Sequence, residues 1–89
     1  TSLGCWSDNH NRALQGRSTS SNSMTTEMCA SFCSEFAIFG TEFGSQCFCG
    51  NVLWSGAQFE DPRVGCTSPC QGNGGETCGG TWALSIYTH

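Results

Sequence analysis

The sequence has 89 residues, eight of them cysteine, and a formal net charge of −4 at pH 7, with three arginines and no lysine. A chain of this length buries only about 60–65% of the surface that it exposes when unfolded, so a hydrophobic core alone gives it a small stability margin. The cysteine content is typical of a secreted, disulfide-bonded domain, and the acidic balance excludes a basic surface for nucleic acid or anionic lipid.

The first 23 residues predict little regular structure. Leu3–Trp6 is interpreted as a short strand, because it is a mainly apolar run that a turn-rich stretch follows. From Arg17 to Ser23 the sequence "RSTSSNS" has no hydrophobic periodicity. We therefore expect an exposed loop at 17–23.

The next segment, "MTTEMCASFCSEF", predicts an α-helix over about 26–36. Thr25 is a favourable N-cap, and Glu27 lies in the first turn, where the helix dipole favours a carboxylate. The apolar positions repeat at i, i+3, i+4 and i+7, the spacing of one helix face, and we expect both phenylalanines among them to be buried. These positions are Cys29, Phe32, Cys33 and Phe36.

The sequence "AIFGTEFGSQCFCG" predicts a β-hairpin with its turn at 43–45. Side chains alternate along a strand, so Cys47 and Cys49 project from one face, whereas Cys29 and Cys33 share one side of the helix. The natural pairing is Cys29 with Cys47 and Cys33 with Cys49, which fastens the helix across the hairpin. A two-residue turn also places Gly40 opposite Cys47, where the missing side chain leaves room for the helix.

The C-terminal third predicts irregular loops and one strand. Residues 51–65 show no pattern, and the glycines of "CTSPCQGNGGETCGG" exclude a long regular element. The closing "TWALSIYTH" alternates as a final strand does. A Cys70–Cys78 bond is the most economical pairing of the remaining cysteines and leaves Cys5 with Cys66, but spacing does not prove it, because eight cysteines allow 105 connectivities.

The resulting prediction is one α+β domain over 1–89: a main helix fastened by disulfides across a small antiparallel sheet, with long irregular loops. Four thiolates from Cys-x-x-x-Cys and Cys-x-Cys are an alternative zinc site, but we expect disulfides and no metal or cofactor. The seven carboxylates are scattered, with no pair or Ser-His-Asp signature, so we expect no enzyme activity. No apolar run approaches the ~20 residues of a membrane span.

Several motifs together resemble the WSC domain family of fungal cell-wall sensors, secreted fungal enzymes and some animal receptors. All eight cysteines have counterparts in that family. The departures are aromatic: Trp6 and Phe43 stand where tyrosine is common, and Trp82 stands where a polar or basic residue often precedes the last strand. The matching motifs are "LGCWSD" (3–8), "RALQG" (12–16), "MTTEMCASFC" (24–33), "FGTEFGSQCFCGN" (39–51), "CTSPCQGNGGETCGG" (66–80) and "LSIY" (84–87).

The resemblance implies four disulfides and a role in binding polysaccharide. The implied pairs are Cys29–Cys47 and Cys33–Cys49, as above, completed by Cys5–Cys66 and Cys70–Cys78. Family members are described as binding fungal wall glycans such as β-1,3-glucan, mannan or chitin, and some as binding xylan. The resemblance also implies an extracellular or wall-associated location, and the N-terminus lacks a signal peptide, so we interpret the chain as a segment of a larger secreted or wall-anchored protein.

Exposed aromatic residues are the candidate ligand contacts, because sugar rings stack their C–H faces on aromatic side chains. Three Trp, six Phe and one Tyr are more than so small a core is expected to bury. Phe48 is predicted to lie on the strand face opposite the cysteines, across from Phe39, and to pack under the 51–65 loop. The candidate carbohydrate contacts are Trp54, Phe59, Trp82, Trp6 and Phe43.

The function predicted from the sequence is a non-catalytic carbohydrate-binding module for a neutral cell-wall polysaccharide, with β-1,3-glucan first and chitin, mannan or xylan next. Such a module anchors a secreted enzyme or a wall sensor. The alternative is an extracellular protein-interaction or mechanosensory module whose exposed aromatic residues contact another domain or a second copy.

Overall fold

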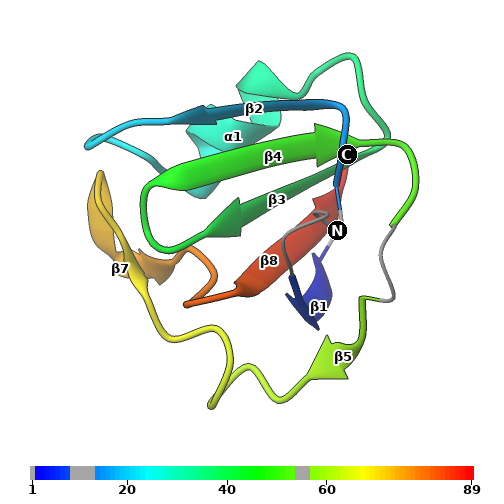
Figure 1. Ribbon diagram of the computed structural model, residues 1–89. Helices are drawn as coiled ribbons and strands as arrows, with labels where there is room; N and C mark the ends of the chain where they lie inside the picture. The colour runs from blue at the N-terminus through cyan, green and yellow to red at the C-terminus, as the bar shows by residue number, and fades with distance from the viewer. Residues whose placement is uncertain (1, 9–13, 54–56) are drawn as a thin grey trace.

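The computed structural model describes residues 2–8, 14–53 and 57–89. Within them, six antiparallel strands form one sheet in the order β2-β4-β3-β8-β1-β5, one helix covers a face of that sheet, and β6 and β7 form a separate ribbon (Figure 1). The expected α+β class is confirmed. None of the helical structure in these ranges has the length and apolar character to cross a membrane. The elements are β1 Ser2–Ser7, β2 Arg17–Ser20, α1 Thr26–Phe32, β3 Ile38–Glu42, β4 Gln46–Gly50, β5 Phe59–Glu60, β6 Pro69–Cys70, β7 Asn73–Thr77 and β8 Ala83–Thr88.

Helix α1 begins as predicted and ends earlier. Thr25 has an extended backbone, and its Oγ1 accepts a hydrogen bond from the Met28 N–H at 3.0 Å, so the N-cap is confirmed. The helix stops at Phe32, four residues before the predicted end at Phe36. Beyond Cys33, the bonds tighten to the i→i−3 type, with the Phe36 N–H donating to the Cys33 carbonyl at 2.9 Å. Phe36 packs with Phe32 against the same core, so the apolar spacing continues beyond the end of the helix.

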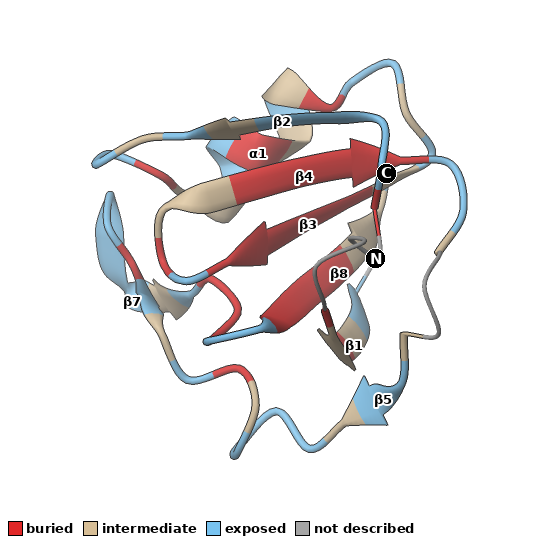
Figure 2. Cartoon of the chain, in the orientation of Figure 1, coloured by how far each residue is buried: buried red, intermediate tan, exposed pale blue. Residues whose placement is uncertain are grey.

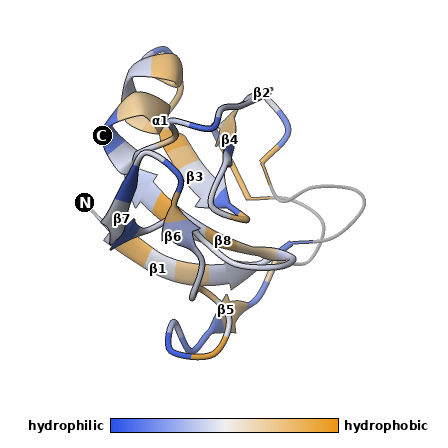
Figure 3. Ribbon diagram, turned by 90° about the vertical axis from the view of Figure 1, so that its left-hand side faces the viewer, coloured by the Kyte–Doolittle hydropathy of each residue, from blue (hydrophilic) through white to orange (hydrophobic). Residues whose placement is uncertain are grey.

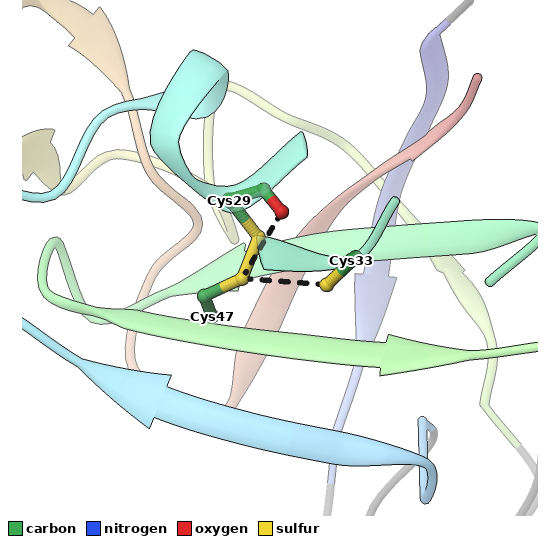
Figure 4. Close-up of side chains that lie close together, drawn as sticks. All are labelled: Cys29, Cys33 and Cys47. Atoms are coloured by element: carbon green, nitrogen blue, oxygen red, sulfur yellow. Dashed lines mark hydrogen bonds between the residues drawn. A yellow bond between two sulfur atoms is a disulfide. The ribbon is translucent and has the colours of Figure 1, made fainter. Parts of the chain in front are cut away.

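The four predicted disulfides are present. Cys29–Cys47 and Cys33–Cys49 join α1 to β4, Cys5–Cys66 joins β1 to the loop before β6, and Cys70–Cys78 closes the β6–β7 ribbon. Figure 4 shows Cys33 beside the Cys29–Cys47 disulfide: Cys33 Sγ is 3.6 Å from Cys47 Sγ, van der Waals contact for two sulfurs. The helix is therefore held against the sheet by a compact sulfur cluster.

The hairpin register differs from the prediction. Its turn is three residues long, 43–45, so Gly40 pairs with Phe48, Thr41 with Cys47 and Phe39 with Cys49. The predicted pairs of Gly40 with Cys47 and Phe39 with Phe48 are wrong, because one additional turn residue shifts the register by one. Gly40 instead leaves room on the face away from the helix, where a Cβ would lie 3.2 Å from Leu14 and 3.3 Å from Leu84.

The predicted loop at 17–23 is also wrong in part, because β2 (Arg17–Ser20) pairs with β4 at the edge of the sheet. An edge strand with little burial has no need for alternating apolar residues, so periodicity could not reveal it. Its Arg17 guanidinium lies 5.2 Å from the centre of the Phe32 ring, which holds β2 to α1. The irregular 51–65 segment contains the two-residue strand β5, which pairs with β1.

The sheet has a separate core on each face. Figure 2 shows that the central strands β3, β4 and β8 are largely buried and the edge strands β2 and β5 are not. In the side view of Figure 3, α1 lies at one end of the molecule and β5 at the other. The helix-side core consists of Met24, Phe39 and the cysteines 29, 33, 47, 49, 70 and 78; the opposite core consists of Leu14, Phe48, Leu84 and Ile86. Phe48 is thus packed, as predicted, with Leu53 and Ala57 of the following loop beside it.

Candidate functional site

Two of the five candidate aromatic residues meet at one corner of the sheet. Phe43 and Trp82, which are far apart in sequence, line one open pocket of about 170 Å³. These two residues are 58% and 43% exposed, so neither is buried in the core. We refer to this site as the Phe43–Trp82 pocket; its remaining lining residues are Glu42, Gln46 and Thr81.

Two turns that are bonded to each other place these aromatic residues. Phe43 opens the β3–β4 turn, and its N–H donates to the Gly80 carbonyl at 3.2 Å. Gly80 also exchanges two backbone hydrogen bonds with Ala83, so Trp82 lies in a tight turn that leads into β8. The Trp82 carbonyl accepts the Asp8 N–H at 2.8 Å, which joins this turn to the end of β1. Backbone hydrogen bonds therefore join three segments around the pocket: the β3–β4 turn, the turn before β8 and the end of β1.

The backbone at both aromatic residues is left-handed. Among the described residues other than glycine, a positive φ occurs at Phe43 (55°) and Trp82 (56°). This conformation brings Cβ close to the carbonyl oxygen and costs an L-residue about 1–2 kcal/mol, whereas glycine adopts it freely. Residues in such conformations cluster at binding and catalytic sites. Two bulky aromatic residues that line one pocket thus both hold a backbone conformation that L-residues rarely adopt.

The polar groups of the pocket complement the rings. Glu42 ends β3 and is only 3% exposed, and Gln46 lies directly opposite it at the start of β4. Thr81 is exposed beside Trp82. A carboxylate, an amide and a hydroxyl next to two aromatic rings can bind a sugar, whose C–H face stacks while its hydroxyls form hydrogen bonds. Sequence reasoning missed these three residues, although the first two flank the predicted hairpin turn.

Trp6 and Phe59 form a second aromatic pair outside this pocket. They are register partners on β1 and β5, and their rings meet edge to face with centroids 5.5 Å apart. The Trp6 indole N–H donates to the Leu3 carbonyl at 2.9 Å. Phe59 is 64% exposed. The structure thus separates the predicted contacts into two pairs, and the fifth, Trp54, lies outside the described residues.

The cysteines of the alternative zinc site are all in disulfides. The sulfurs of Cys29, Cys33 and Cys47 lie within 4.8 Å of one another. Each is bonded to another sulfur, so none is present as the thiolate that zinc requires.

Comparison with known proteins gives a consistent result. The family model described as "WSC domain" matches residues 2–80. A "WSC domain-containing protein" of Arthroderma benhamiae is 35% identical over 94% of this chain, "Kremen protein 1" of Mus musculus is 36% identical over 96%, and "Xylosyltransferase oxt" of Drosophila pseudoobscura pseudoobscura is 36% identical over 97%. The chain spans only 12%, 19% and 10% of these three relatives, respectively.

Proposed function

Because the chain belongs to the WSC domain family, we propose that it is a non-catalytic module that binds a neutral cell-wall polysaccharide in the Phe43–Trp82 pocket. The observation that carries this proposal is the convergence of two exposed aromatic residues, both with a left-handed backbone, on one pocket. WSC domains are commonly carbohydrate-binding, and the lining groups suit a pyranose ring.

The lining residues favour a neutral ligand over an acidic one. Glu42 is the charged residue among those that line the pocket, and the whole chain carries a net charge of −4. A polysaccharide rich in carboxylate or sulfate would meet like charge there and gain no cationic partner. β-1,3-Glucan is therefore the first ligand to test, followed by chitin, mannan and xylan.

In its parent protein this module would act as an anchor. The chain corresponds to 12% of the Arthroderma relative, which leaves most of such a protein for other domains. Four disulfides in so small a chain fit an extracellular domain. Binding to an insoluble wall polymer would then hold a secreted enzyme or a sensor at the wall.

A protein-interaction module is the second candidate, and one observation favours it. Phe59 and Val64 are apolar, are 64% and 79% exposed, and are not among the residues that line the Phe43–Trp82 pocket. Exposed apolar side chains of this size can contact another domain or a second copy of the chain. Contact of Phe59 and Trp6 with a glycan stays a prediction.

A pull-down with insoluble polysaccharides tests the proposal. The purified domain is incubated with β-1,3-glucan, chitin, mannan, xylan and cellulose, and retention is compared with that of Phe43→Ala and Trp82→Ala. We expect wild-type retention on at least one polymer and about tenfold weaker binding for each variant, because a stacked ring contributes on the order of 1.5 kcal/mol. Val64→Ala is the matched control for the loss of an exposed apolar side chain.

Three outcomes separate the two candidates. Loss of retention in both pocket variants, with Val64→Ala unchanged, supports the proposal. Full retention in both pocket variants contradicts the choice of site. Absence of retention on every polymer, together with a dimer of the wild-type chain that Phe59→Ala dissociates, supports the protein-interaction module instead.

A further inference from the structure

A second and larger cavity lies against the Cys5–Cys66 disulfide. Its volume is about 330 Å³, and it shares no lining residue with the Phe43–Trp82 pocket. Four separate segments build its wall: β1, the turn before Cys66, the end of β7, and β8. Besides the disulfide, the residues that matter for its chemistry are Arg63, Thr77, Ser85 and Tyr87.

The strand residues of the two cavities lie on opposite faces of the sheet. Ser85 and Tyr87 alternate along β8 with Leu84 and Ile86, which belong to the opposite core, so the second cavity lies on the helix side. Glu42 of the first pocket is the register partner of Leu84, so its side chain shares the other face. The sheet therefore separates Glu42 from the second cavity.

Several groups in the wall of the second cavity are held in place by bonds and packing. The disulfide fixes β1 to the 62–66 turn, and the Tyr87 ring stacks on Phe39 with centroids 5.4 Å apart and an interplanar angle of 19°. Ser85 is buried, and its Oγ accepts the Gly79 N–H at 3.0 Å, so its own O–H proton is left to donate. Groups that are already held in place lose little conformational entropy when a ligand binds.

The charge of this cavity is compensated. The Arg63 side chain donates to both carboxylate oxygens of Asp61, at 3.2 and 3.0 Å. These side-chain hydrogen bonds, together with one from the Arg63 backbone N–H, lower the pKa of Asp61, so the pair stays doubly ionised and neutral overall at neutral pH. Arg63 is the charged residue among those that line the cavity. An aromatic ring with hydroxyl groups, beside an arginine that Asp61 neutralises, suits a neutral polyhydroxylated ring.

We propose that this cavity is a second carbohydrate site, which takes a neutral sugar ring from a different chain than the one in the Phe43–Trp82 pocket. The inference shares its ligand class with the proposed function and uses none of the same residues. A domain with a site on each face of its sheet bridges two polysaccharide chains, and it gains avidity on a dense polymer surface without any increase in affinity at either site.

Amide chemical shifts of the ¹⁵N-labelled domain test this inference. The domain is titrated with soluble hexasaccharides of β-1,3-glucan, chitin, mannan and xylan, and the titration is repeated with Phe43→Ala. We expect at least one probe to shift the amides of residues 63, 77, 85 and 87, and we expect these shifts to persist in Phe43→Ala. Thr77→Val and Arg63→Ala, both at exposed positions, should each weaken binding at this site about fivefold, because each removes a hydrogen-bonding group. Val52→Ala, at an exposed position that lines neither cavity, is the control.

The result separates the two proposals. Amides around the second cavity that no probe shifts, or that lose their shifts in Phe43→Ala, would overturn the second site and leave the first intact. Shifts at residues 63, 77, 85 and 87 without shifts at residues 42–46 and 81–82 would support the second site and contradict the first. Two sets of shifts that saturate independently would support both.

Discussion

The two faces of the sheet are stabilised in different ways. On the helix side, six half-cystines surround Met24 and Phe39: two disulfides join α1 to β4, and a third closes the β6–β7 ribbon that packs against them. The opposite core consists of Leu14, Phe48, Leu84 and Ile86, and depends on packing alone among residues from remote segments. A small chain can therefore support two thin cores, provided that one of them is cross-linked.

The comparison also explains where the candidate sites lie. Cross-links and strand pairing fix the backbone of the β3–β4 turn and of the turn before β8, so these turns can hold strained aromatic residues. Strain of this kind persists only where the surrounding structure over-determines the conformation. The disulfides thus contribute to the sites by supplying rigidity, although none lines the Phe43–Trp82 pocket.

The largest expected effect comes from removing the cross-links on the helix side. The variant with alanine at Cys29, Cys33, Cys47 and Cys49 loses two disulfides, each worth roughly 3 kcal/mol in the chain-entropy model. Against a typical total of ~5–15 kcal/mol, we expect this variant to be unfolded at 25 °C by circular dichroism. The control is the Cys70→Ala/Cys78→Ala double variant. It loses one disulfide, which joins cysteines only 8 positions apart in the sequence, and it should stay folded. Cooperative, native-like unfolding of the fourfold variant would contradict this reading of the helix-side core.

A smaller effect is expected on the opposite face. Leu84 is fully buried between β3 and β1, and Leu84→Ala should lower the free energy of unfolding by about 2–5 kcal/mol, the usual cost of a cavity in a core. Denaturant titration measures this loss. Leu3→Ala removes the same atoms from a 37% exposed side chain on β1 and should cost less than about 1 kcal/mol. Equal losses in the two variants would show that the opposite core adds little to stability.

The smallest effect has the opposite sign. Phe43→Gly relieves a left-handed backbone, and we expect it to raise the free energy of unfolding by about 0.5–1 kcal/mol while it weakens polysaccharide retention. Phe59→Gly is the matched control, because Phe59 is similarly exposed but lies in a strand, where glycine is unfavourable. A Phe43→Gly variant that is less stable than the wild type would mean that the ring contributes more to packing than to ligand binding.

Patterns confined to one segment could be interpreted from the sequence. The N-cap at Thr25, the hairpin turn and the shared face of Cys47 and Cys49 all follow from the backbone geometry of a single element. The pairing of Cys29 and Cys33 with those two cysteines could also be predicted, because the helix and the hairpin follow one another in the sequence. The apolar spacing that includes Phe36 made the predicted helix too long, because the turn after the helix keeps the Phe36 ring against the same core.

Features that depend on contacts between remote segments were decided by the tertiary structure. The strand β2 lacks an apolar pattern because it lies at an edge, and the register of Gly40 depended on one residue in the turn. The aromatic residues were candidates by type alone. Their separation into the Phe43–Trp82 pocket and the Trp6–Phe59 pair follows from which strands are neighbours in the sheet.

By itself, the sequence determined that this is a disulfide-bonded α+β domain, because cysteine spacing and helix and strand periods are local properties, and its motifs carried the resemblance to the WSC domain. Only the tertiary structure decided which aromatic rings share a pocket, that Glu42 and Gln46 lie beside them, and that a second cavity lies against the Cys5–Cys66 bond. The physical reason is that a binding site is formed by side chains from several segments, and cross-strand register brings those side chains together.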